Sequence, residues 1–285
     1  MTLPNSLTNQ RETKRPFRLA APTAGATTLR LVLMLVVNLS LLAAIAFPIM
    51  AYINPPGAHT PWYAWVMMLA WQPLMALQGI VWHRFVDKRP LAELPWRWDG
   101  GARRAALWGS LLTILLMAAF VGLTAMTGLT TWRWNSATLP ITAILFTLLT
   151  ASAGFGEEIM FRGYVMRTLG HLGARWAAVL SSVIFALMHT TTGRINPLDL
   201  LALFLHGYFF ALLAQRTKSV WPGMIIHFLY NGLTCLVWAN NLDASPLLFD
   251  GNLTVVKWVY KAAMVIPYLL MLWLLDRKQQ RTQNA

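Results

Sequence analysis

The sequence predicts an all-α fold, a polytopic transmembrane helical bundle of about eight spans with both termini in the cytoplasm. Three observations predict it. Of the 285 residues, 57% are hydrophobic and only 12% are charged, a balance that soluble domains of this size do not show. Apolar stretches long enough to cross a bilayer recur along the chain. Basic residues fall in short clusters between these stretches.

The apolar stretches are the first basis for the span count. Crossing about 30 Å of hydrocarbon at about 1.5 Å per residue takes roughly 20 residues. The predicted spans cover residues 29–53, 62–83, 105–127, 138–157, 174–190, 198–214, 220–240 and 255–275. Basic residues precede the first span, as they would a signal peptide, but the span stays apolar through Met50. We therefore expect it to be retained in the protein.

The basic residues give the orientation, because Lys and Arg concentrate in cytoplasmic loops. Nineteen of the 23 lie in or beside the N-terminal tail, in the segments 84–104, 162–175 and 216–218, and in the C-terminal tail. The four on the other side are Arg133, Arg194, Lys257 and Lys261. Both termini are therefore predicted to be cytoplasmic. The net charge of +13 is spread over these clusters rather than over one face, so we expect a lipid bilayer and no nucleic acid as partner.

Two adjacent carboxylates, Glu157 and Glu158, belong to a predicted span, whereas the other acidic residues lie in tails, loops or span ends. An acid inside the bilayer is costly and marks a functional site by default. Successive helical residues point about 100° apart, so the two glutamates should have different roles. Glu158 shares a helix face with Arg162 and can form an ion pair with it, which leaves Glu157 able to act as a general base. The alternative is a solvated cytoplasmic helix end.

Three histidines, His189, His206 and His227, also lie inside predicted spans. If the helix that carries Glu157 turns near residues 170–173, Glu157 and His189 differ in depth by only about 5 Å. His227 and Asn231 are four residues apart and present one helix face. Each histidine alone is better explained as a core residue, but together with the acids and the amide they share one layer of the bundle. We therefore predict a site there.

This set of side chains can activate a water molecule in two ways. Glu157 can take a proton from water that His189 orients, while His227 and Asn231 donate hydrogen bonds to the developing oxyanion. Alternatively, Glu157, His189 and His227 can bind a zinc ion that acidifies the water. The sequence lacks the HExxH motif, so a zinc site would have to be assembled from several helices. Both routes lead to peptide hydrolysis within the membrane.

Four ordered motifs carry a family resemblance. They are Glu157-Glu158-xxx-Arg162, Phe185-xxx-His189, Phe204-xx-Gly207 and His227-xxx-Asn231. In this order and at these separations, over roughly residues 137–240, they resemble the CPBP family. That family groups the type II CAAX prenyl proteases with bacterial Abi-type and bacteriocin self-immunity proteins.

The resemblance implies an intramembrane endopeptidase. The family has been described both as glutamate-dependent and as metal-dependent, that is, as metalloendopeptidases. It implies Glu157 as the water-activating carboxylate, supported by Glu158 and Arg162. His189 would be a water or metal partner, and His227 with Asn231 would stabilise the oxyanion. Ala211 stands where many members have a second glycine, a departure that affects packing. His206 lies outside the pattern and is an auxiliary candidate.

The resemblance also organises the chain. We expect a disordered basic tail at 1–26, N-terminal transmembrane helices at 27–136, the protease core at 137–240, and the last transmembrane helix with a basic tail at 241–285. The expected setting is a bacterial inner membrane, with the active site towards the cytoplasm and a membrane-associated peptide or protein as substrate. The alternatives are a non-catalytic immunity or scaffold protein of the same fold and, less favoured because the sequence shows no inverted repeat, a proton-coupled transporter.

Overall fold

The computed structural model describes residues 24–53, 62–136, 140–192, 196–238 and 247–283. Eight helices of at least 15 residues dominate these segments, in agreement with the predicted helical fold. They are α1 (Ala24–Ile53), α2 (Trp62–Val81), α3 (Gly100–Met126), α4 (Pro140–Glu158), α6 (Ala174–Met188), α7 (Pro197–Thr217), α8 (Trp221–Trp238) and α9 (Leu253–Gln283). The predicted tail over residues 1–23 lies outside the described residues, and Ala24 already belongs to α1.

Short elements extend or connect these helices. Among the described residues they are η1 (Trp82–Val86), η2 (Leu91–Glu93), η3 (Ile159–Val165), α5 (Met166–Thr168), η4 (Leu169–Leu172) and η5 (His189–Thr192). The elements η3, α5 and η4 continue α4 without a break up to the turn before α6. That turn falls at Gly173, whose φ of 89° is a backbone conformation that glycine adopts readily.

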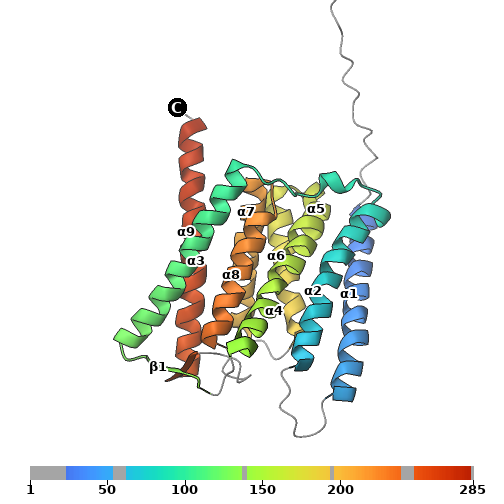
Figure 1. Ribbon diagram of the computed structural model, residues 1–285. Coiled ribbons are helices and arrows are strands. Elements are labelled where there is room, and N and C mark those ends of the chain that lie inside the picture. The colour runs from blue at the N-terminus through green and yellow to red at the C-terminus, as the bar shows by residue number, and fades with distance from the viewer. Residues whose placement is uncertain (1–23, 54–61, 137–139, 193–195, 239–246, 284–285) are drawn as a thin grey trace, which may run out of the picture.

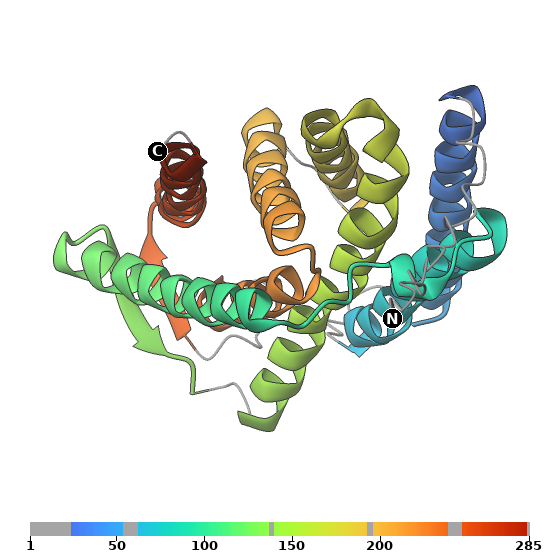
Figure 2. The ribbon, with the colours of Figure 1, turned by 90° about the horizontal axis from the view of Figure 1, so that it is seen from above.

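The helices form one bundle in which α1 and α9 lie at opposite edges (Figures 1 and 2). Contacts follow the order α1, α2, α4, α8, α3, α9, α7 and α6, and the most extensive contact is that between α4 and α8. The N-terminal end of α1 and the C-terminal end of α9 lie at the same end of the bundle (Figure 1). This arrangement requires an even number of crossings between them, as the predicted spans have.

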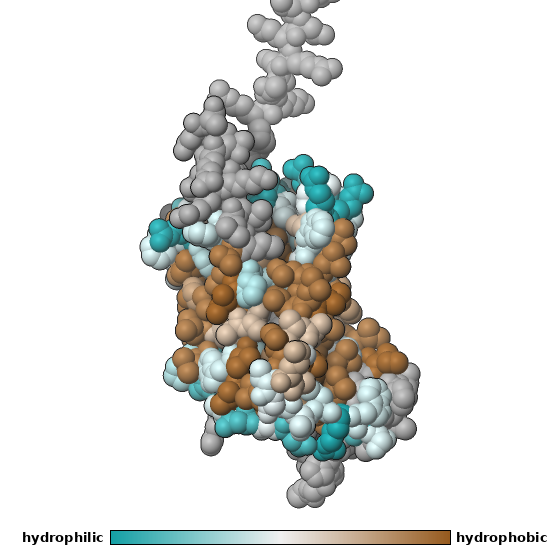
Figure 3. Space-filling model, turned by 90° about the vertical axis from the view of Figure 1, so that its left-hand side faces the viewer, coloured by the Kyte–Doolittle hydropathy of each residue, from teal (hydrophilic) through white to brown (hydrophobic). Residues whose placement is uncertain are grey.

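The surface carries an apolar band. In Figure 3, apolar side chains cover the middle of the visible face and polar ones lie above and below it. Of the helices within the described residues, α3 and α7 are long and apolar enough to cross a membrane. The most apolar 18-residue window of α3 is only 28% buried, with Leu115 and Leu123 among its exposed side chains. Such a surface is unfavourable in water and suits lipid.

A small β-sheet was not predicted. Strands β1 (Thr130–Trp134) and β2 (Leu247–Gly251) pair in antiparallel register, with Trp132 opposite Phe249. The β1 segment reads TTWRW, and β-branched and aromatic residues favour strands. The sheet joins the segment after α3 to the segment before α9 at the lower end of the bundle in Figure 1. The fold is therefore mostly helical rather than purely all-α.

Glycines let the central helices approach each other closely. A Cβ atom at Gly154 of α4 would lie 2.9 Å from the His227 Cβ and from the Phe228 amide nitrogen of α8. A Cβ at Gly156 would lie 2.4 Å from the carbonyl oxygen of Gln72 in α2. Both positions require the absence of a side chain. The part of α4 that leads to the two glutamates is thus held tightly between α2 and α8.

Candidate active site

The centre of the site is an ion pair that is fully enclosed. Glu158, the last residue of α4, lies 3.2 Å from the Arg162 guanidinium in η3, and neither side chain has any exposed surface. Arg162 also donates a hydrogen bond of 2.8 Å from Nη2 to the Gly207 carbonyl of α7. Its guanidinium lies 4.7 Å from the centre of the Phe185 ring, within range of a cation–π interaction. The alternative of a solvated helix end is wrong for these two residues.

Two glycines make room for this pair. A Cβ atom at Gly223 of α8 would lie 2.9 Å from Oε2 of Glu158. A Cβ at Gly207 would lie 3.0 Å from the Phe185 ring and 3.2 Å from Nη2 of Arg162. In the sequence, Gly207 is part of the Phe204-xx-Gly207 motif. In the structure it also allows the approach of the guanidinium to the backbone of α7.

His227 of α8 lies between the two glutamates. Its Nδ1 is 3.2 Å from Oε1 of Glu158, and its Nε2 is 3.7 Å from Oε2 of Glu157. The ring of Phe210 stacks on the imidazole at 4.9 Å between ring centres. The sequence predicted different directions for the two carboxylates, and they do approach from different sides. They nevertheless meet the same imidazole, which the sequence did not predict.

The formal charges within this group do not balance. Two carboxylates and one guanidinium leave one negative charge in excess, and buried charges need compensation. One additional proton, on His227 or on Glu157, makes the group of Glu157, Glu158, Arg162 and His227 neutral.

His189 follows α6 and is oriented by its own helix. Its Nδ1 donates a hydrogen bond of 2.8 Å to the Phe185 carbonyl, because a carbonyl oxygen can only accept. The neutral imidazole therefore carries its lone pair on Nε2. The ring packs against Phe185, with 4.6 Å between ring centres. Phe185 thus touches both His189 and Arg162, which couples the positions of the two side chains.

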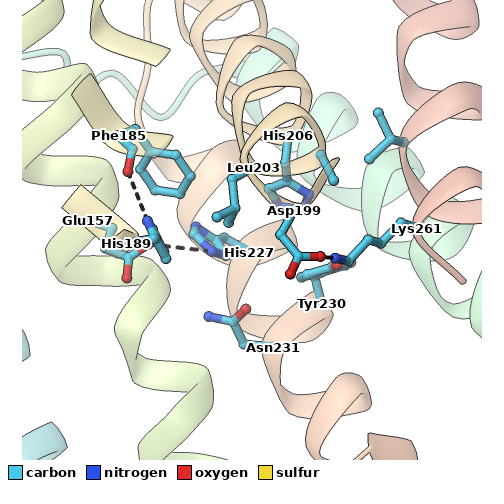
Figure 4. A pocket seen from close by; sticks show the side chains of 12 residues that line it. Glu157, Phe185, His189, Asp199, Leu203, His206, His227, Tyr230, Asn231 and Lys261 are labelled. Carbon is cyan, nitrogen blue, oxygen red and sulfur yellow. Dashed lines mark hydrogen bonds and ion pairs between the residues drawn. The ribbon is translucent and has the colours of Figure 1, made fainter. Parts of the chain in front are cut away.

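A cavity of about 300 Å³ joins these groups. It is lined by Glu157, Phe185, His189, Asp199, Ala202, Leu203, His206, His227, Tyr230, Asn231, Lys261 and Val265. In Figure 4, Glu157, His189, His227 and Asn231 surround one part of it, which we call the motif side. Asp199, Tyr230 and Lys261 lie on the opposite part, towards α9, and with Val265 form what we call the α9 side. The site residues predicted from sequence therefore meet in or directly behind one cavity.

The sequence reasoning missed the α9 side. Asp199 of α7 and Lys261 of α9 form an ion pair across the cavity wall. Lys261 was assigned only to the loops on the non-cytoplasmic side, although it falls inside the apolar span 255–275. A lysine within such a span was the available signal. Asp199 was treated as a span end.

The described residues offer no group of three His, Cys, Asp or Glu side chains that could hold a metal ion. Glu157, His189 and His227 are therefore not gathered as a three-ligand zinc site in the described part of the chain. We derive no chemical step through a metal.

The fold and the site define a helical membrane protein in which glutamates, histidines and an amide lie around one cavity. Residues 137–233 match the family model of the type II CAAX prenyl endopeptidases, described as Rce1-like. The chain therefore carries a domain of the CPBP family, and the resemblance predicted from the four motifs is confirmed. A search of curated proteins finds no match.

Proposed function

We propose that the chain is an intramembrane endopeptidase that hydrolyses a peptide bond of a membrane-associated polypeptide with a water molecule activated by Glu157. The observation that carries the proposal is the position of His227, between Glu157 at the cavity and the enclosed Glu158–Arg162 pair. A structural histidine needs one partner. An imidazole held by one carboxylate, with a second carboxylate 3.7 Å from its other nitrogen beside a cavity, suits proton transfer.

In the proposed reaction, Glu157 removes a proton from water and the water oxygen attacks the scissile carbonyl carbon. His189 orients the water through its Nε2 lone pair. The oxyanion that forms accepts hydrogen bonds from the amide of Asn231 and from Nε2–H of protonated His227. As the C–N bond breaks, Glu157 returns the proton to the leaving nitrogen. The products are a carboxylic acid and an amine, so atoms and protons balance.

Glu158 and Arg162 act as positioning residues in this scheme. Glu158 accepts the hydrogen bond from Nδ1 of His227, which fixes the ring and favours a proton on Nε2 when the oxyanion forms. Arg162 compensates the charge of Glu158 and anchors it to α7 through Gly207. The proposed role of the pair is therefore to hold His227 charged and oriented without itself contacting substrate.

The proposed setting follows the distribution of basic residues. Lys and Arg cluster at the end of the bundle where α1 begins and α9 ends, and that end is proposed to be cytoplasmic in a bacterial inner membrane. The substrate is proposed to be a polypeptide that reaches the cavity from the lipid bilayer. Lipidation of the substrate is a variable of the experiment.

The test uses purified full-length protein in proteoliposomes with a set of quenched fluorescent peptides, each in a lipid-anchored and a free form. Wild-type protein is expected to cleave members of the anchored set, whereas Glu157→Gln should not. Glu93→Gln is the matched control, because Glu93 lies in an exposed segment where it pairs with Arg167. Absence of cleavage by the wild type across the whole set would favour a non-catalytic immunity or scaffold protein.

The metal question is addressed with the same preparation. We expect activity to survive dialysis against a zinc chelator, because the described site does not present three metal ligands together. Elemental analysis of the dialysed protein provides the independent readout. Loss of activity with the metal, and recovery when zinc is added back, would replace the glutamate scheme with a metal-dependent one.

A further inference from the structure

We propose that the α9 side of the cavity is a substrate subsite that binds the peptide backbone, with the Asp199–Lys261 pair and His206 as its hydrogen-bonding groups. This inference rests on the proposed function. It adds a role for residues that lie outside the four motifs. Lys261 and Val265 also lie outside the matched residues 137–233, so α9 contributes to the cavity wall from beyond the family domain.

His206 lines the cavity with a side chain that is almost fully buried. Only 5% of the residue is exposed, and its Nε2 atom is buried with no hydrogen-bond partner among the described residues. The ring lies between the two sides, with 5.4 Å to the ring centre of His227 and 4.4 Å to that of Tyr230. A buried polar atom without a partner is unfavourable. A peptide N–H or C=O group that enters the cavity can supply the missing hydrogen bond.

Asp199 and Lys261 present one acceptor and one donor side by side. They come from α7 and α9, and their side chains remain 28% and 23% exposed. Lys261 also lies 5.0 Å from the centre of the Trp258 ring, which helps to hold the ammonium group. The pair is neutral overall. A charged ligand group would be attracted by one member of the pair and repelled by the other, so its charge gains little there.

A peptide group matches this pair better than a charged group does. It is neutral and carries one N–H donor and one C=O acceptor, which can face Asp199 and Lys261, respectively. Leu203 and Val265 supply apolar wall for the neighbouring side chains. Charged groups within an apolar helix face are costly and mark function by default. Part of the Asp199 carboxylate's role is local, because it lies in the first turn of α7, where the helix dipole favours it.

The first experiment separates binding from chemistry. The double variant Asp199→Leu/Lys261→Met removes both charges together and leaves no orphaned ion. On the peptides cleaved by wild type, it is expected to raise KM about tenfold and to leave kcat within about threefold. His206→Phe should act in the same direction, and His206→Gln, which retains a donor and an acceptor, should recover part of the affinity. Lys257→Met, one turn earlier on α9 and outside the cavity lining, is the control.

The second experiment identifies the group that is bound. Each peptide bond of a cleaved peptide is N-methylated in turn, which removes its N–H donor. One position should raise KM in wild type and have no further effect in Asp199→Leu/Lys261→Met. Equal sensitivity at every position in both proteins would overturn the inference. If N-methylation changes nothing, but amidation of the peptide's C-terminus removes the difference in KM between wild type and Asp199→Leu/Lys261→Met, the subsite binds a carboxylate. The backbone proposal is then wrong.

The failure of this inference is distinguishable from that of the proposed function. If wild type cleaves no peptide, both the proposed endopeptidase function and the proposed subsite are wrong. If wild type cleaves and Glu157→Gln does not, the proposed function stands. An unchanged KM in both the double variant and His206→Phe would then overturn the subsite alone. Melting temperatures of all variants, measured in the same detergent, show whether a change in KM follows from loss of fold.

Discussion

The two sides of the cavity are built differently. On the motif side, Glu158 and Arg162 have no exposed surface, and glycines hold the helices around them in close contact. On the α9 side, the Asp199–Lys261 pair keeps about a quarter of its side-chain surface exposed and spans two helices at the edge of the bundle. The difference indicates a division of labour. Under the proposed roles, the pair that positions His227 is enclosed and pre-organised, and the groups proposed to bind a ligand remain reachable.

The largest expected effect tests the chemistry of the motif side. Glu157→Gln keeps the size of the side chain and removes the base, so kcat should fall by about 10²- to 10⁴-fold, the range for loss of a general base. Because Glu157 is proposed to act on water rather than to bind peptide, KM should change little. Single-turnover cleavage in proteoliposomes measures this. If Glu157→Gln raised KM and left kcat unchanged, Glu157 would bind substrate rather than activate water. The proposed difference between the motif side and the α9 side would then be wrong.

The next effect tests the enclosure of the motif side. Arg162→Met leaves the Glu158 charge buried without its partner, which should cost about 3–5 kcal/mol of unfolding free energy. The loss is read from denaturation in detergent micelles. Arg167→Met is the matched control, because Arg167 pairs with Glu93 at a partly exposed site. It should cost no more than about 1 kcal/mol. Equal losses in the two variants would mean that the pair is not enclosed in solution.

A smaller effect tests the close packing behind His227. Gly154→Ala places a Cβ atom 2.9 Å from the backbone of α8, where it cannot be accommodated without moving that helix. We expect a loss of about 1–3 kcal/mol in stability, together with reduced activity, since His227 would shift. Gly122→Ala is the control, because a Cβ there meets nothing within 4 Å. In the interior of α3 it should stabilise by about 0.5–1 kcal/mol.

The smallest expected effect is on stability, and it concerns a residue far from both sides of the cavity. Asp99 caps α3, and the hydrogen bond from the Ala102 amide, with the nearby Arg97, holds the pKa of the carboxyl below its ordinary value of 3.8. A depressed pKa in the fold means that the cap stabilises above pH 3.8 and is lost as the pH falls through the folded value. Asp99→Ala should therefore lower the melting temperature at neutral pH, and the difference should vanish in acid. Cleavage kinetics should be unchanged in Asp99→Ala, in contrast to the variants of residues that line the cavity.

Much of the fold could be predicted from the sequence, because it depends on long apolar stretches. The eight stretches correspond to the eight long helices within the described residues, and the turn at Gly173 falls where predicted. The β-sheet was missed because its strands pair across more than a hundred residues, and five-residue segments carry too weak a pattern. The π-helical turn η3 was missed because nothing in the local sequence distinguishes it from the end of an α-helix.

The site was predictable where helical spacing sufficed. The ion pair of Glu158 with Arg162 follows from their separation of four residues. The hydrogen bond between Glu158 and His227 was not predictable, because it depends on how closely α4 approaches α8 at Gly154. The pairing of Asp199 with Lys261 depends on which helix stands beside α7. Helix order in the bundle is a tertiary property that one sequence does not reveal.

The position of α9 has a consequence for how such proteins diversify. This helix supplies a wall of the cavity, yet it lies outside the matched residues 137–233. Under the two proposals, exchanging α9 would alter ligand preference and leave Glu157 and His227 in place. Grafting α9 segments between homologues, rather than redesigning the four motifs, is the economical route to new substrate choice.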